Sequence, residues 1–318
     1  LTPESNEKIL FEILDSDQQA TIKEHRDFDK AYALEGVGRF RCNLFYQQRG
    51  IGAVFRIIPA TILTVDQLNL PDVVRSFADY QRGMVLVTGP TGSGKSTTMA
   101  AIIDLINDTH AKHIITIEDP LEFVHPNKKC IFSQREIGSH ALSFGKALSV
   151  ANREDPDIIL VGEMRDLETI ALAMEAAMTG HVVFGTLHTM NAMKTVDRII
   201  EIFPADQQGQ VRSTLADALK AVVSQTLFKR IDKKGRCAAQ EILICTPAVR
   251  NLIREAKTYQ IPSAMQTGKK YGMATLDDTI EELLKRRMIS ADDAYINCIE
   301  KKRFLGYMKK PPTDFTDA

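Results

Sequence analysis

The feature that most constrains the fold is a glycine-rich segment that follows a short apolar run. Residues 84–88, Met-Val-Leu-Val-Thr, are apolar and β-branched, which predicts a buried strand. Residues 89–96 read Gly-Pro-Thr-Gly-Ser-Gly-Lys-Ser and fit the spacing G-x-x-x-x-G-K-[ST], and helical periodicity continues over 97–107. A strand, this loop and a helix in that order form a P-loop. The sequence therefore predicts a nucleoside-triphosphate site in an α/β domain.

The residue types in the loop match this chemistry. Its glycines let the backbone bend so that N–H groups line a phosphate-sized concavity at a helix N-terminus. Lys95 can reach the β- and γ-phosphates of ATP, and the Ser96 hydroxyl can hold Mg²⁺. The alternative is a glycine-rich turn with a surface lysine, which the flanking strand and helix disfavour. The predicted cofactor-binding residues are Gly89, Pro90, Thr91, Gly92, Ser93, Gly94, Lys95, Ser96 and Thr97.

Three further buried strands are predicted after the P-loop helix, and each runs into polar residues. They span 113–117, 157–161 and 181–185, and helical stretches at 141–153 and 167–178 separate them. This alternation predicts a mostly parallel, doubly wound sheet whose carboxyl edge collects the polar side chains. From residue 196 onward a largely helical pattern is expected, with one long helix or two over 207–230 and a late strand over 237–244. Helices are also expected at 248–256, 275–287 and 291–304.

Carboxylates and histidines at the predicted strand ends are the candidate reactive groups. Glu163 follows an apolar strand, which is the Walker B pattern, so its carboxylate would orient Mg²⁺ directly or through a water molecule. Glu122 follows the preceding strand in the segment Glu-Asp-Pro-Leu-Glu. His188 fits a γ-phosphate sensor or a water-orienting donor. His181 taken alone is more typical of a structural residue.

The first part of the chain has a different character. Helices are expected at 2–14 and 17–28, and strands at 31–34, 38–46 and 53–58, which together indicate a small α+β domain. Arginines are frequent here, at positions 39, 41, 49 and 56. A solvated sheet face is the simpler interpretation, but beside a P-loop domain such a face could reach a neighbour's γ-phosphate in trans. We expect residues 1–60 to form this domain, 61–80 a linker, and 81–318 the ATPase domain.

Composition narrows the class of protein. Forty Lys and Arg balance 41 Asp and Glu over 318 residues, and this net charge of −1 argues against a nucleic-acid partner. No apolar run approaches the roughly 20 residues that a membrane-spanning helix needs. The five cysteines are scattered without a C-x-x-C pair, which favours reduced thiols and a cytoplasmic location. The chain begins Leu-Thr-Pro-Glu without a methionine, so a preceding segment is expected to be missing.

Several segments together resemble a known family. They are 89–96 (Walker A), 117–123 (aspartate box), 153–166 (Walker B), 179–189 (histidine box), 40–43 and 52–56 in the first domain, and 248–255 near the end. With them the chain resembles the secretion-type hexameric ATPases, and within these the PilT/PilU-type retraction (twitching motility) ATPases of type IV pili. The resemblance covers essentially the whole chain.

The resemblance carries expectations of its own. It implies a RecA-like P-loop core with C-terminal helices, preceded by a PAS-like domain whose first strands are absent. It implies a homo-hexameric, ATP-hydrolysing motor for pilus retraction, cytoplasmic and peripheral at the inner membrane at the pilus base. The implied partners are an inner-membrane pilus platform protein and a paralogous retraction ATPase.

The resemblance also implies residue roles. Glu122 would be the general base and Glu163 the Walker B acid, although which of the two is the base stays open. His181 and His188 would act near the phosphates or couple the site to the neighbouring subunit. Arg41 and Arg56 would reach an adjacent subunit's nucleotide, with Arg39 and Arg49 as nearby alternatives.

Two alternatives stand beside the motor. A pilus-assembly or type II secretion ATPase of the same superfamily usually carries a tetracysteine zinc element, which this chain cannot build without a C-x-x-C pair. A nucleotide-binding accessory subunit that does not hydrolyse ATP would not need Glu122, Glu163 and His188.

Overall fold

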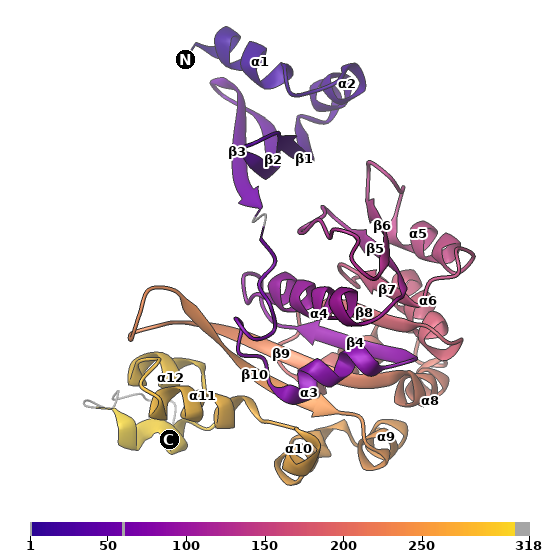
Figure 1. The fold of residues 1–318 in the computed structure, drawn as a ribbon, viewed down its shortest axis with the longest axis vertical. Helices are drawn as coiled ribbons and strands as arrows, with labels where there is room; N and C mark the ends of the chain where they lie inside the picture. The colour runs from indigo at the N-terminus through magenta and orange to yellow at the C-terminus, as the bar shows by residue number, and fades with distance from the viewer. Residues whose placement is uncertain (1, 59–60, 309–318) are drawn as a thin grey trace.

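The computed structural model describes residues 2–58 and 61–308, and these form two sheets. Figure 1 shows the three-stranded sheet with two helices at one end of the long axis and the seven-stranded sheet with its covering helices at the other. The expected boundary between residues 60 and 61 adjoins a stretch outside the described residues. The last ten residues of the expected C-terminal region also lie outside them. Among the described residues, no helix is long and apolar enough to cross a membrane.

The first sheet has the antiparallel order β1-β2-β3 and packs beneath two helices. Its elements are α1 (Pro3–Phe11), α2 (Ser16–His25), β1 (Asp27–Leu34), β2 (Gly38–Gln47) and β3 (Gly50–Ile58). Thr2 caps α1, because its side chain accepts the N–H of Ser5. Cys42 and Leu44 of β2 are buried in the small core. Since side chains alternate along a strand, Arg39 and Arg41 share the opposite face.

The second sheet has the order β10-β9-β4-β8-β7-β5-β6. Its strands are β4 (Gly83–Thr88), β5 (His113–Glu118), β6 (Ile131–Glu136), β7 (Ile158–Val161), β8 (Val182–Leu187), β9 (Leu219–Lys229) and β10 (Arg236–Ile244). All neighbouring pairs are parallel except β9 with β10. Every residue of β4, β7 and β8 is buried, as in a sheet that helices cover on both faces. The predicted doubly wound, mostly parallel sheet is confirmed.

Helices form a layer on each face of this sheet. One face carries α3 (Asp72–Arg75), η1 (Ser76–Asp79) and α4 (Lys95–Thr109). The other carries α5 (Phe144–Ala151), α6 (Leu167–Met178), α7 (Ala192–Glu201), α8 (Gln208–Ala218), α9 (Pro247–Arg254) and α10 (Ile261–Thr267). Val74 and Phe77, which lie in the expected linker, are buried in the α4 layer.

The C-terminal elements pack on the long β9–β10 hairpin. They are α11 (Leu276–Lys285), α12 (Ala291–Asn297) and α13 (Lys301–Phe304), followed by the 3-10 turn η4 (Leu305–Tyr307). Two earlier 3-10 turns, η2 (Thr258–Gln260) and η3 (Lys269–Tyr271), lie against α10. The single helix expected over 291–304 is wrong. It breaks after Asn297 because the Asp277 carboxylate accepts the N–H groups of Ile299 and Glu300, each at 2.8 Å.

The helix expected over 207–230 is also wrong in its second half. Helix α8 ends at Ala218 and the chain continues directly as β9. In β9, residues Ala221, Val222 and Val223 are all fully buried, with β4 on one side and β10 on the other. When both faces of a strand are buried, its sequence lacks the alternation of apolar and polar residues that distinguishes a strand from a buried helix.

Candidate active site

The P-loop joins β4 to α4 through backbone conformations that require glycine. Gly89, Gly92 and Gly94 have φ of +139°, +80° and +88°. A Cβ on Gly89 would lie 2.3 Å from the carbonyl oxygen of Gln225, and one on Gly94 would lie 2.8 Å from its Nε2. Neither position leaves room for a side chain, so the close approach of β9 and the left-handed φ both select glycine.

Gln225 of β9 holds the loop from the neighbouring strand. Its Nε2 donates to the carbonyl oxygen of Ser93 at 2.6 Å, and its Oε1 accepts the Thr98 hydroxyl at 2.8 Å. Beside it, the hydroxyls of Thr88 and Ser224 lie 2.7 Å apart. Sequence reasoning missed this support because β9 was expected to be helical. The polar Ser-Gln pair inside an apolar run is the signal that could have indicated it.

The first turn of α4 presents donors toward the loop. The first bond within the helix runs from the Thr98 N–H to the Gly94 carbonyl at 3.0 Å. The N–H groups of Lys95, Ser96 and Thr97 therefore have no intrahelical acceptor, and they lie at the positive end of the helix dipole. The Ser93 hydroxyl is buried and lacks a hydrogen-bond partner within the described residues. This set of donors fits a chain of anionic phosphates.

Lys95 lies over the loop and is partly buried. Its Nζ donates to the carbonyl oxygens of Gly89 at 2.8 Å and Pro90 at 3.1 Å. Burial lowers the pKa of Lys95, and the negative charge of Glu163 opposes that effect. The ammonium is thus within electrostatic range of the acid that follows β7.

Glu163 and His188 meet at the carboxyl edge because β7 and β8 are parallel neighbours. Nε2 of His188 lies 2.8 Å from Oε1 of Glu163, and its Nδ1 lies 3.5 Å from Nζ of Lys95. Arg165 pairs with the same Glu163 oxygen. Burial alone would raise the pKa of Glu163, but the hydrogen bond from Arg165 and the charge of His188 outweigh it and lower that pKa. The structure therefore brings an ionised acid, an imidazole and the P-loop lysine together.

Glu122 lies beyond β5 at the same edge of the sheet and is partly exposed. Its N–H donates to Oε2 of Glu118 at 3.2 Å. Glu118 is the last residue of β5, and its burial raises the pKa of its carboxyl group to about 7. The structure thus places a second carboxyl group next to Glu122, and the role of Glu122 as general base stays a prediction.

His181 does not lie at this edge. Its carbonyl oxygen accepts the N–H of Gly83 at 3.0 Å, and its Nδ1 lies 3.1 Å from the carbonyl oxygen of Ala176 at the end of α6. Strand β8, residues 182–187, separates His181 at its start from His188 at its end. The expected place near the phosphates of its own chain is wrong, since His181 directly precedes β8, at the amino edge of the sheet. A contact with a neighbouring subunit stays a prediction.

Arg41 and Arg56 are cross-strand partners on β2 and β3. They belong to the sheet that lies apart from the P-loop of the same chain in Figure 1. Arg39 is engaged differently, because its Nη2 donates to Oε2 of Glu136 at the end of β6, at 3.0 Å. Arg39 is thus engaged within its own chain, and the action of Arg41 and Arg56 in trans stays a prediction.

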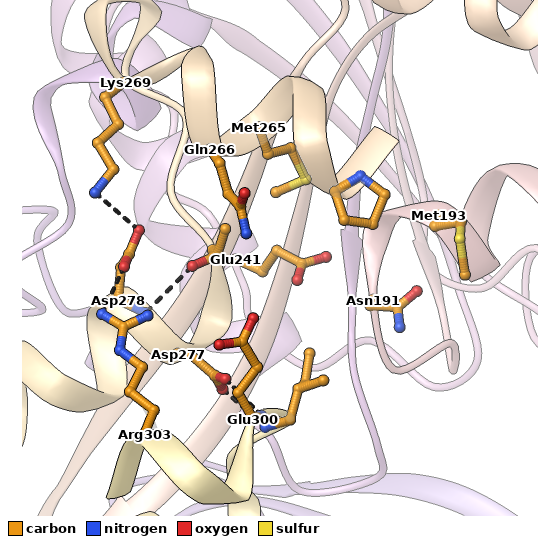
Figure 2. A pocket seen from close by; sticks show the side chains of 13 residues that line it. Asn191, Met193, Glu241, Met265, Gln266, Lys269, Asp277, Asp278, Glu300 and Arg303 are labelled. Atoms are coloured by element: carbon orange, nitrogen blue, oxygen red, sulfur yellow. Dashed lines mark hydrogen bonds and ion pairs between the residues drawn. The ribbon is translucent and has the colours of Figure 1, made fainter. Parts of the chain in front are cut away.

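A cavity of about 460 Å³ lies among α10, α11 and the C-terminal turns (Figure 2). Its charges are largely paired internally: Lys269 and Arg303 lie 3.1 Å and 2.7 Å from the two oxygens of Asp278. The buried Glu241 accepts the N–H of Ala192 at 2.7 Å. None of the P-loop residues, Glu122, Glu163 or His188 lines this cavity.

Known proteins share much of this chain's sequence and fold. Residues 54–243 match the family described as "T2SSE: Type II/IV secretion system protein". The chain is 54% identical to "Type IV pilus retractation ATPase PilT" of Pseudomonas aeruginosa, over 90% of this chain and 83% of the relative. It is also 54% identical to "Twitching motility protein" of Neisseria gonorrhoeae, over 89% of this chain and 75% of the relative.

A solved structure extends the match to the fold. The crystal structure of the pilus retraction motor PilT with bound ADP superposes with a TM-score of 0.89 at 46% identity, over 95% of this chain and 86% of that chain. The similarity in sequence and in fold therefore covers both sheets and the P-loop. This chain belongs to the type II/IV secretion system protein family, in its branch of PilT-type type IV pilus retraction ATPases.

Proposed function

We propose that this protein is the subunit of a hexameric, Mg²⁺-dependent ATPase that powers type IV pilus retraction. The observation that carries the proposal is the convergence of Lys95, Glu163 and His188 at the P-loop edge. The similarity to retraction ATPases supports pilus retraction as the work to which hydrolysis is coupled.

Nucleotide binding follows from the donors around the loop. The N–H groups of Lys95, Ser96 and Thr97 and the Lys95 ammonium bind the phosphates of ATP. When bound, Mg²⁺ would neutralise charge on the β- and γ-phosphates. The Ser96 hydroxyl and the ionised Glu163 would hold it, directly or through water.

Hydrolysis needs a base that accepts a proton from the attacking water. Glu122 is assigned that role because it is partly exposed at the correct edge and is not engaged by Arg165 and His188 as Glu163 is. The water oxygen forms a bond to the γ-phosphorus, the bond to the β–γ bridging oxygen breaks, and ADP and phosphate leave. His188 orients the water or senses the γ-phosphate, and Glu163 alone as the base is the alternative.

The arginines supply the reason for a ring. Arg41 and Arg56 belong to the first sheet and the P-loop follows β4 of the second, so in a homo-hexamer we assign the two arginines to the adjacent subunit's nucleotide. In other nucleotide hydrolases, an arginine from a neighbouring molecule stabilises the negative charge of the transition state for phosphoryl transfer. In this proposal the ring lies in the cytoplasm at the inner membrane and acts on the pilus platform protein, with a paralogous retraction ATPase as partner and no nucleic acid.

Two measurements test the proposal. ATP hydrolysis by the native chain should depend on Mg²⁺, should rise cooperatively with protein concentration, and should be lost in Glu122→Gln. A bacterium that lacks its own retraction ATPase should regain twitching with the native chain and not with Glu122→Gln. Robust hydrolysis without recovered twitching would instead favour the assembly or secretion ATPase, and absent hydrolysis would favour the accessory subunit.

A further inference from the structure

One carboxylate oxygen connects the first sheet to the segment that carries Glu122. Oε2 of Glu136 accepts Nη2 of Arg39 at 3.0 Å and the N–H of Leu121 at 3.1 Å. Arg39 comes from β2, Glu136 ends β6, and Leu121 directly precedes Glu122. We call these contacts the Arg39–Glu136–Leu121 link.

We propose that Arg39 is a positioning residue that acts through Glu136 to set the place of Glu122 during hydrolysis. The orientation of the first sheet would thereby control whether the base is in position. This inference rests on the proposed function, since it assumes that Glu122 takes the proton from water.

Because Glu136 is buried, its hydrogen bond to the Leu121 N–H depends on the presence of the Arg39 guanidinium. Its side chain is 7% exposed, whereas that of Arg39 is 25% exposed. A buried carboxylate that loses its cationic partner turns toward other donors, because an unpaired buried charge is costly. That rearrangement weakens its hydrogen bond to the Leu121 N–H. Within the described residues, the only other side chain that donates to the Glu136 carboxylate is Ser139. Its hydroxyl lies 3.3 Å from Oε1, farther than Arg39 lies from Oε2.

The segment that carries Glu122 is anchored from both sides. The Leu121 N–H is bound by Glu136, and the Glu122 N–H is bound by Glu118 at 3.2 Å. Leu121 is buried, at 5% exposure, so its side chain gives the backbone little freedom to follow another course. A loss of the Glu136 anchor leaves the Leu121 N–H without this acceptor, which disturbs the backbone at the residue before the base but makes no direct change at the P-loop.

Kinetics on the assembled protein test the proposal first. Arg39→Gln should lower kcat about tenfold and leave KM for ATP nearly unchanged, because a base displaced by a fraction of an ångström loses rate, not substrate binding. Arg39→Lys keeps a cationic donor and should restore most of kcat. Arg236→Gln, an exposed arginine at the start of β10, is the matched control and should behave as the native chain does.

A double-mutant cycle separates this role from a direct one. If Arg39 acts through Glu136, then Arg39→Gln, Glu136→Gln and the double variant should show the same kcat. If Arg39 contacts a neighbour's phosphates instead, the two effects should multiply, and the proposal is overturned. Recovery of kcat at high protein concentration would also overturn it, because the defect would then lie in ring assembly.

Amide hydrogen exchange gives a readout that does not need hydrolysis. Peptides that cover 119–125 should exchange at least about tenfold faster in Arg39→Gln than in the native chain, while peptides from α4 should not change. Unchanged exchange in 119–125 would refute the link even in an active enzyme. Faster exchange in a chain that does not hydrolyse ATP would refute the proposed function and keep the link.

Discussion

Nε2 of His188 lies 2.8 Å from Oε1 of Glu163, and the other ring nitrogen lies 3.5 Å from the Lys95 ammonium. The imidazole thus stands between the acid and the P-loop lysine. The three residues come from the ends of β7 and β8 and from the start of α4, so only the pairing of parallel strands brings them together. This geometry makes definite predictions for enzyme kinetics.

The first prediction concerns the Glu163–His188 pair. Glu163→Gln and His188→Ala should each lower kcat by about a hundredfold or more, because each removes a charged or hydrogen-bonding group at the reacting phosphate. The double variant should be little worse than either single one, since the two side chains act together. Steady-state hydrolysis of all three variants measures this. Fully multiplicative losses would show that the pair is not a functional unit.

The second prediction concerns Lys95. Lys95→Ala should weaken ATP binding by roughly tenfold to a hundredfold, the range expected when charge-assisted hydrogen bonds are lost. Calorimetric titration with a non-hydrolysable ATP analogue and Mg²⁺ measures the change. Lys234→Ala, in the exposed β9–β10 turn, is the control and should bind as the native chain does. Equal affinities for both variants would argue against a phosphate contact by Lys95.

The third prediction concerns Arg41 and Arg56, which lie opposite each other on β2 and β3. The Arg41→Ala, Arg56→Ala double variant and the Glu122→Gln variant should each be nearly inactive alone. When the two are mixed and reassembled, activity should return at up to roughly a quarter of the sites, where a subunit with intact Glu122 faces intact arginines. Subunit mixing followed by hydrolysis assays tests this. No recovery in mixed rings would exclude action in trans.

The fourth prediction concerns Glu118. Burial raises the pKa of its carboxyl group from an ordinary 4.5 to about 7. Between these values the folded protein keeps a proton that the unfolded chain has lost. The stabilisation is therefore complete below pH 4.5 and is lost as pH rises through 7. Relative to Glu118→Gln, the native chain should lose about 3 kcal/mol of unfolding free energy over that range.

Urea unfolding of both chains at several pH values measures this difference. Glu201→Gln changes an exposed carboxylate and should show no such pH-dependent difference from the native chain. A constant difference between native and Glu118→Gln chains from pH 4.5 to 8 would mean that Glu118 is ionised throughout.

The two histidines show why candidate residues can be recognised in sequence but not always placed. His181 begins the predicted strand and His188 follows its end, and the family resemblance implies that both act near the phosphates or couple the site to the neighbouring subunit. The strand runs from Val182 to Leu187, so its direction puts His188 at the carboxyl edge and His181 at the amino edge. The family resemblance names both residues, sequence position already favours His188, and the strand direction within the parallel sheet places the two at opposite edges.

Strand β9 shows a limit of a different kind. Periodicity could not identify it, because the strand is buried on both faces in the interior of the sheet. The same error hid Gln225, whose side chain supports the P-loop from β9. A tertiary environment that covers both faces removes the alternation that sequence patterns depend on.

The sequence by itself determined the P-loop, the doubly wound sheet and the acids at its edge, because each depends on residues that are close together in the chain. Strand, glycine-rich loop and helix are contiguous, and local backbone sterics are enough to specify them. The tertiary structure alone decided which distant groups meet. Strand order in the large sheet brings Gln225 to Ser93 and His188 to Glu163, and the contact between the two sheets brings Arg39 to Glu136. No local periodicity encodes these pairs.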